Sequence, residues 1–87
     1  MKNTQLGRRV VAGAFGATLR AIRLEHGMSQ DTLADRCDFD RTYPSLLERG
    51  LRHPTLWMVL RLAHALDMEP TRLVIETVER LRREAES

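Results

Sequence analysis

The stretch SQDTLADRCDFDRTYPSLLERG, residues 29–50, decides the fold. It holds two short helical patterns, and the serine that opens it is a residue type that caps helices. Apolar residues line one face of the first pattern, which ends near Cys37. Asp40 can cap the second pattern, which covers about 41–49, and Gly50 can end it. The three residues between the patterns leave room only for a tight turn, so the stretch predicts two short helices joined closely.

Longer helical patterns flank this pair on both sides. Before it, an amphipathic helix is predicted to run to about His26, with Gly27 as its stop. After it, Thr55 can cap a fourth helix, and Pro70 can begin a fifth that runs to about Ala85. The apolar stripes predicted to face the core are Val11, Phe15, Leu19 and Ile22 on the first helix, and Leu56, Val59, Leu60, Ala63 and Leu66 on the fourth. We therefore expect an all-α fold of five helices, with a helix-turn-helix at the second and third.

The length of 87 residues and the hydrophobic content of 43% suit one small packed domain rather than a disordered chain. The polar start, residues 1–7, is predicted to be a flexible arm, and residues 8–87 are predicted to form the single domain. Thirteen of the 14 basic residues are arginine, although 12 acidic residues leave a net charge of only +2. This arginine content fits recognition of phosphate or guanine, but a GC-rich genome produces it as well. The isoelectric point of about 9.3 is typical of nucleic-acid-binding domains.

The sequence also argues against several other classes of protein. Its single cysteine, Cys37, excludes an internal disulfide, and its place on the inner stripe of the second helix predicts a packed thiol. No apolar stretch is long enough to span a membrane, and the first residues lack the apolar core of a signal peptide. We therefore expect a cytoplasmic protein that makes no membrane contact.

Patterns typical of catalytic and metal sites are missing. The three histidines, His26, His53 and His64, have no metal-ligand spacing with each other or with the cysteine. The sequence has no glycine-rich phosphate loop and no arrangement of nucleophile, base and acid. We therefore expect no enzyme activity, no metal, no cofactor and no small-molecule substrate.

The third helix separates polar from apolar side chains. With about 100° between successive residues, one arc carries Arg41, Thr42, Ser45, Leu46 and Arg49. Pro44 and Leu47 point to the opposite side, where the core would lie. A mostly polar face with an arginine at each end suits the major groove of DNA, where side chains reach base edges and flanking phosphates. An ordinary solvated helix face would show the same arc, so the arc alone leaves both interpretations open.

A longer series of residues resembles one protein family. It consists of Leu19-Arg20-x-x-Arg23, Gly27-Met28-Ser29-Gln30, Leu33-Ala34, Asp40-Arg41-Thr42-Tyr43-x-Ser45-x-Leu47-Glu48-Arg49-Gly50, Pro54-Thr55-Leu56 and Leu60-x-Leu62-Ala63-x-Ala65-Leu66. With these spacings, the stretch from Phe15 to about Val74 resembles the Cro/lambda-repressor-like (XRE) family of helix-turn-helix DNA-binding proteins. The short chain and the start of its third helix also resemble the controller proteins of restriction–modification systems.

The resemblance implies roles for individual residues. The base-contacting positions would be Arg41, Thr42, Ser45 and Leu46. The phosphate-contacting positions would be Gln30, Tyr43 and Arg52, to which the polar arc adds Arg49. Arg23 and Glu48 match a pair that usually forms a partly buried ion pair between the first and third helices. Double-stranded DNA is therefore the expected partner.

Three residues depart from the family's pattern. Pro44 replaces a branched apolar residue and is expected at the fourth helical position, where it would remove one intrahelical hydrogen bond. Asp38 stands where glycine is common, and aspartate tolerates the left-handed conformation better than most residues. Leu46 is apolar where a polar residue is usual, so it would contact either a thymine methyl group or another protein.

Two surfaces predict contacts with a protein. On the fifth helix, Val74, Val78 and Leu81 have the spacing of a helix-pairing seam. Trp57 and Met58 are expected to point outward from the fourth helix, as interface residues or as scattered surface residues. We expect a homodimer, which would set two third helices about 34 Å apart on a pseudo-palindromic operator.

The function expected from these features is sequence-specific regulation of transcription, such as repression, although the sequence does not decide between repressor and activator. The alternative is a protein-interaction module, such as an antitoxin of the same fold that neutralises a toxin. Its contact surface would consist of Leu46, Leu51, Trp57 and Met58.

Overall fold

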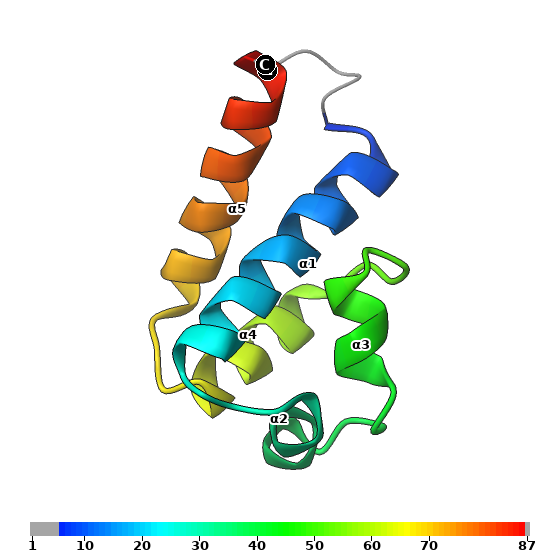
Figure 1. The fold of residues 1–87 in the computed structure, drawn as a ribbon, viewed down its shortest axis with the longest axis vertical. Helices are drawn as coiled ribbons and strands as arrows, with labels where there is room; N and C mark the ends of the chain where they lie inside the picture. Colours follow the sequence, from blue (N-terminus) through cyan, green and yellow to red (C-terminus); the bar gives the residue numbers. More distant parts are fainter. Residues whose placement is uncertain (1–5, 87) are drawn as a thin grey trace.

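The computed structural model describes residues 6–86, and that part of the chain is all-helical, as expected. The helices are α1 (Arg8–Glu25), α2 (Gln30–Cys37), α3 (Tyr43–Glu48), α4 (Leu56–Ala65) and α5 (Pro70–Glu86). Figure 1 shows α1 and α5 side by side and antiparallel, with α3 against the other side of α1. Helices α2 and α4 close the end of the molecule at which α1 finishes. The arm predicted over residues 1–7 lies mostly outside the described residues, of which only Leu6 and Gly7 precede α1.

The predicted caps fix the ends of the central helices. The Ser29 hydroxyl oxygen accepts a hydrogen bond from the Thr32 backbone N–H at 3.0 Å, so α2 begins where expected. Thr55 caps α4 in the same way. Asp38 ends α2 in the left-handed conformation with φ 56°, which confirms the role predicted for an aspartate at this position. The turn between α2 and α3 therefore needs no glycine.

The start of α3 differs from the prediction. The helix begins at Tyr43 rather than near residue 41, and Asp40 does not cap it. The Asp40 carboxylate accepts hydrogen bonds from the backbone N–H and the hydroxyl of Thr42, which favours a local turn over helix. Pro44 consequently occupies a position in the first turn, where a backbone N–H has no helical partner. The prediction that this proline removes an intrahelical hydrogen bond was wrong.

The prediction of the inner face of α4 is wrong at two positions. Val59, Ala63 and Leu66 are buried as predicted, but Leu56 is 73% exposed and Leu60 is 48% exposed. Leu62 and Ala65 take their places in the core. The sequence of α4 is apolar at nearly every position, so its periodicity does not identify the buried side.

One core joins all the helices. It is formed chiefly by Phe15, Leu19, Ile22, Leu33, Cys37, Leu47, Leu62, Leu66 and Leu73. Burial raises the pKa of the Cys37 thiol, which keeps the sulfur protonated and confirms it as a packing group. No described helix is long and apolar enough to cross a membrane.

Helix α3 packs unusually close to α1 at Gly16. A Cβ atom at this position would lie 2.2 Å from the Leu47 carbonyl oxygen and 2.7 Å from that of Glu48. Only a residue without a side chain therefore allows the end of α3 to sit on α1. Gly13, one turn earlier on the same helix, has open space around its missing Cβ.

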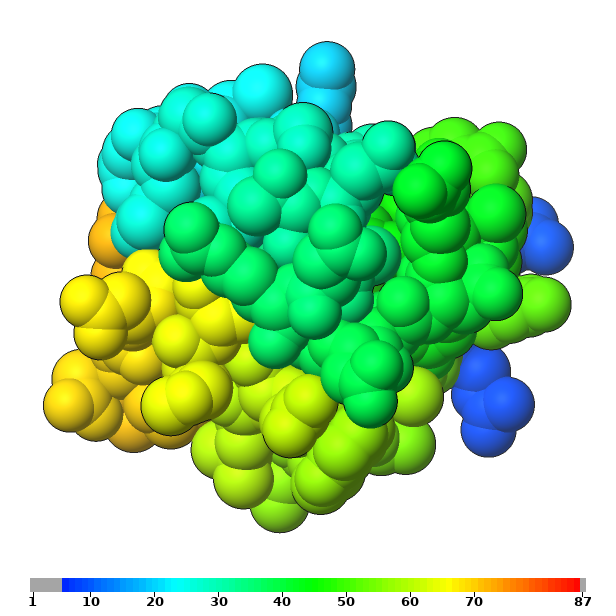
Figure 2. Space-filling model, turned by 90° about the horizontal axis from the view of Figure 1, so that it is seen from below, coloured from blue at the N-terminus to red at the C-terminus, as the bar shows by residue number. Residues whose placement is uncertain are grey.

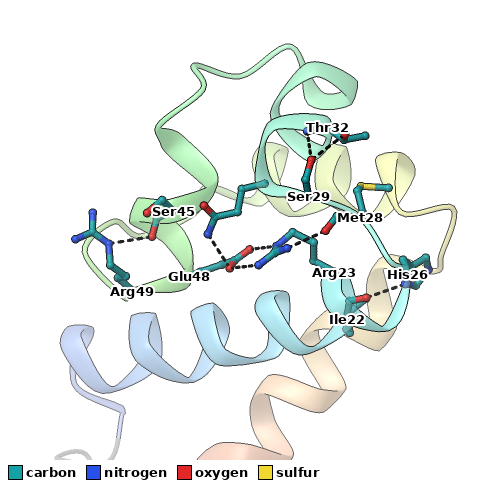
Figure 3. Close-up of polar contacts among 10 residues, drawn as sticks. Ile22, Arg23, His26, Met28, Ser29, Thr32, Ser45, Glu48 and Arg49 are labelled. Carbon is teal, nitrogen blue, oxygen red and sulfur yellow. Dashed lines mark hydrogen bonds and ion pairs between the residues drawn. The ribbon is translucent and has the colours of Figure 1, made fainter.

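A buried ion pair fixes the same contact. Arg23, near the end of α1, donates from Nε and Nη2 to the two carboxylate oxygens of Glu48 at 2.6 and 2.9 Å. Its Nη1 donates to the Met28 carbonyl at 2.8 Å, so the guanidinium also holds the loop before α2 (Figure 3). The two side chains are 8% and 2% exposed. The hydrogen bonds and the charge of Glu48 raise the pKa of Arg23, which favours its charged form.

We expect Gly16→Ala and Gly13→Ala to change stability in opposite directions. The alanine methyl group at position 16 must push α3 away, which costs about 1–3 kcal/mol or more of unfolding free energy. At position 13 the same change should add up to about 1 kcal/mol, because alanine favours helix. Chemical denaturation monitored by circular dichroism measures both. Equal stabilities for the two variants would contradict the close approach of α1 and α3.

We expect Glu48→Gln to lower the unfolding free energy by about 3–5 kcal/mol, because it leaves the Arg23 charge buried without a counterion. Glu76→Gln is the control, since it breaks a partly exposed pair with Arg72 on α5 that is worth about 1 kcal/mol or less. Thermal and chemical denaturation of the two variants give the comparison. A destabilisation of the same size in both would show that burial of the Arg23 pair adds nothing.

Candidate nucleic-acid interface

Helices α2 and α3 pack against each other and share one face of the molecule. Figure 2 shows them together, with α3 next to the loop that leads to α4. Within α3, Pro44 and Leu47 are buried, Ser45 and Leu46 are partly exposed, and Arg49 at the end is exposed. This order matches the arc predicted from the sequence. The face of α3 turned away from the core is therefore available to a partner.

Arg41 and Thr42 lie just before α3 rather than within it, and both are exposed. The Arg41 side chain is 80% exposed, and its Nε lies 4.0 Å from a carboxylate oxygen of Asp31. A solvent-exposed pair at this distance is weak. Arg41 is therefore free to leave Asp31 and bind a stronger acceptor.

Thr42 already donates its hydroxyl hydrogen within the protein. Its hydroxyl donates a hydrogen bond to Asp40 Oδ1 at 2.6 Å, and its backbone N–H donates to the same oxygen at 2.9 Å. These bonds lower the pKa of the Asp40 carboxyl and so favour its charged form. With its only hydroxyl hydrogen used, Thr42 presents lone pairs and a methyl group to solvent. Asp40, expected only as a helix cap, is thus a candidate site residue that sequence reasoning missed.

Gln30 is held by the buried ion pair. Its Nε2 donates to Glu48 Oε1 at 3.1 Å, and the residue is partly exposed at the start of α2. A side-chain amide has two N–H donors, so one of them stays available to a phosphate. The position of this glutamine therefore depends on the contact between α1 and α3.

Tyr43 has an internal partner as well. Its hydroxyl donates to the Met58 sulfur at 3.0 Å, and its ring meets that of Phe39 edge to face at 5.4 Å between centroids. A phenol has one hydrogen to donate, so a phosphate contact requires Tyr43 to release Met58. Without such a contact, the half-buried ring packs at the start of α3.

Arg49 and Arg52 are exposed at the far end of the site. Each donates one hydrogen bond to a nearby carbonyl, Arg49 to Ser45 at 3.4 Å and Arg52 to Leu51 at 3.2 Å. A guanidinium has five N–H donors, so most of them remain available. Figure 3 shows Ser45 and Arg49 on the side of α3 away from the Arg23 pair.

The residues predicted for a dimer interface are not all on the surface. Val74 and Trp57 are 51% and 58% exposed, and Met58 and Val78 are partly exposed. Leu81 is only 4% exposed, so it offers almost no surface to a second subunit. The seam turns inward there because Leu73, Thr77 and Leu81, rather than the valines, form the buried stripe of α5. On α4 and α5, the exposed large apolar residues that the prediction left out are Leu56, Leu60 and Ile75.

Comparison with known proteins identifies the family of this chain. A family model described as a helix-turn-helix domain matches residues 14–74, which include α2, α3 and α4. The control protein C.BamHI of Bacillus amyloliquefaciens is 43% identical over 61 residues, covering 69% of this chain and 75% of that protein.

Two solved structures are similar in both fold and sequence. The restriction–modification controller protein C.AhdI from Aeromonas hydrophila has a TM-score of 0.69 and 45% identity, over 71% of this chain and 94% of that one. The controller protein C.Esp1396I, solved as a tetramer in complex with its natural 35 base-pair operator, has a TM-score of 0.74 and 27% identity, over 82% of this chain and 93% of that one. The chain thus belongs to the Cro/lambda-repressor-like (XRE) family of helix-turn-helix DNA-binding regulators.

Proposed function

We propose that this regulator binds a pseudo-palindromic operator as a homodimer and contacts base edges through α3 and the residues just before it. The observation that carries the proposal is the partly exposed outward face of α3 together with the exposed residues at its two ends, which the buried Arg23–Glu48 pair holds against α1. Groups that are fixed in advance lose little freedom when they bind. This rigidity suits a surface that has to distinguish one sequence from another.

The chemistry of each base contact follows from its side chain. The exposed Arg41 guanidinium matches O6 and N7 of guanine. Thr42, whose hydroxyl hydrogen is held by Asp40, suits an amino group of adenine or cytosine, or a thymine methyl group. Ser45 can donate to or accept from a base edge, and Leu46 can pack on a thymine methyl group. Gln30, Tyr43, Arg49 and Arg52 would set the register through phosphates.

The dimer would use the exposed apolar residues of α5 and α4. Val74 and Ile75 on α5 and Leu56, Trp57 and Leu60 on α4 are all 48% exposed or more. Apolar and aromatic residues of this kind are enriched at the centres of protein interfaces. A two-fold axis would then place two α3 helices about 34 Å apart, one on each half-site.

A selection from random double-stranded DNA at fixed salt tests the operator. We expect an inverted repeat to be enriched, because two identical α3 helices related by a two-fold axis contact the same sequence on opposite strands. Sequencing of the bound pool is the measurement, and sedimentation with a selected duplex gives the stoichiometry. A single unrepeated site bound by one subunit would overturn the dimer, and weak binding of every sequence would overturn the specificity.

We expect Arg41→Ala to relax the preference at one base pair of each half-site by about 1–3 kcal/mol, because alanine cannot bond to the base that Arg41 would contact. Titration of duplexes that differ at that pair measures the change. Arg83→Ala is the matched control, since it removes one exposed arginine from α5 and should leave the preference intact. Equal weakening on every duplex would assign Arg41 to the phosphates instead.

A second candidate function is protein interaction, including the neutralisation of a toxin. It is favoured by the exposed apolar side chains Leu51, Leu56 and Trp57, which are 55%, 73% and 58% exposed. The Trp57 ring also contacts that of Phe39 at a tilt of 48°, and the Arg61 guanidinium lies over it at 5.3 Å, so the ring is held in place for a partner. Absence of any enriched DNA sequence would favour this candidate over the first.

A further inference from the structure

A basic hollow lies beside the α3 surface, between the start of α1 and the loop that joins α3 to α4. Its volume is about 440 Å³, and the charged or ionisable side chains around it are Arg8, Arg9, Arg52 and His53. None of the described residues that line it carries a carboxylate. The hollow therefore gathers positive charge from two segments that are far apart in the sequence.

Two contacts hold the sides of the hollow together. The His53 Nε2 atom is 2.7 Å from the Arg8 carbonyl oxygen, which ties the loop to the first turn of α1. Gly50 packs on the same helix, since a Cβ atom there would lie 3.0 Å from the Cα atom of Gly13. The backbone segments that carry the arginines are thus held together, although the arginine side chains are exposed.

Fold stability does not account for the two arginines at the start of α1. The first turn of this helix has no acidic residue, and a helix N-terminus carries partial positive charge, which disfavours cations. Among residues 6–86, neither guanidinium has a hydrogen-bond or ion-pair partner. Two uncompensated arginines at the positive end of a helix dipole are better explained by an anion that binds them.

The loop that lines the hollow begins at Gly50, directly after the residues that would contact DNA. Helix α3 ends at Glu48, Arg49 follows it, and Arg52 is three residues further on at the rim of the hollow. Arginine binds phosphate through two parallel hydrogen bonds, and its charge is permanent. A DNA backbone that leaves the groove occupied by α3 would pass a row of guanidinium groups here.

We propose that Arg8, Arg9, Arg52 and His53 form a clamp for backbone phosphate of the operator, outside the bases that α3 contacts. This inference rests on the proposed function, and it adds the first turn of α1 to the DNA interface. The clamp would fix the position of the domain on the duplex and carry no sequence preference of its own.

The double variant Arg8→Ala/Arg9→Ala tests the clamp. The affinity for the selected operator duplex is measured between 50 and 200 mM salt, and the slope of log K against log salt should become shallower by about 0.9 for each phosphate that the variant no longer neutralises. The selected sequence should stay the same. The variant should fold normally, because it removes cations from a helix start, and circular dichroism checks this.

Two controls separate the clamp from general attraction. Arg82→Ala/Arg83→Ala removes the same charge from the exposed end of α5 and should leave the salt slope nearly unchanged. Arg8→Lys/Arg9→Lys keeps the two positive charges and should retain most of the salt slope of the unsubstituted protein. Ethylation of the clamped phosphate should block binding of the unsubstituted protein but not of the alanine variant.

Equal slopes for the unsubstituted protein and the Arg8→Ala/Arg9→Ala variant would overturn the clamp and leave the proposed function standing. The same change in slope from the α5 control would also overturn it, because the effect would then be long-range attraction. Failure of the unsubstituted protein to select any sequence would overturn the proposed function, and this inference with it.

Discussion

The buried pair of Arg23 and Glu48 is the constraint on which the functional surface depends. It joins α1 to α3, holds the loop before α2 through Met28, and receives Gln30 from α2. Helix α3 contributes few residues to the core, so apolar packing alone does not fix its orientation on α1. The ion pair fixes that orientation, and Gly16 allows α1 and α3 to pack closely enough for the two side chains to meet. Among residues 6–86, no buried side-chain nitrogen or oxygen lacks a hydrogen-bond partner.

This arrangement separates the residues that hold α3 from those proposed to contact DNA. Arg41 and Arg49 are exposed and take no part in the core, so substitution there should change binding without unfolding the domain. Gln30 and Tyr43 are different, because each already bonds to an internal partner. Their contacts with phosphate would be coupled to the packing of α3, whereas those of the exposed arginines would not. Substitutions at the exposed arginines could therefore change the DNA sequence preference while the packing of α3 stays the same.

The sequence predicts features that rest on local chemistry and misses those that depend on packing between distant segments. The caps at Ser29 and Thr55 follow from one side chain and its own backbone, and both are observed. Asp40 was assigned to the wrong local bond, because a turn and a cap use the same carboxylate. The buried side of α4 and the inward place of Leu81 depend on which neighbours surround them, and periodicity in an apolar helix does not contain that information.

The placement of charges also depends on the fold and cannot be obtained from the composition. For this reason a net charge of +2 gives little support for a nucleic-acid partner. Arg23 and Arg72 are neutralised by carboxylates, and Arg61 is tied to the Cys37 carbonyl at 2.7 Å. These arginines make contacts within the fold. Arg49 and Arg52 keep most of their donors free at the end of α3. The field that a DNA backbone meets is set by the unpaired cations on one face, which a sum over the whole chain conceals.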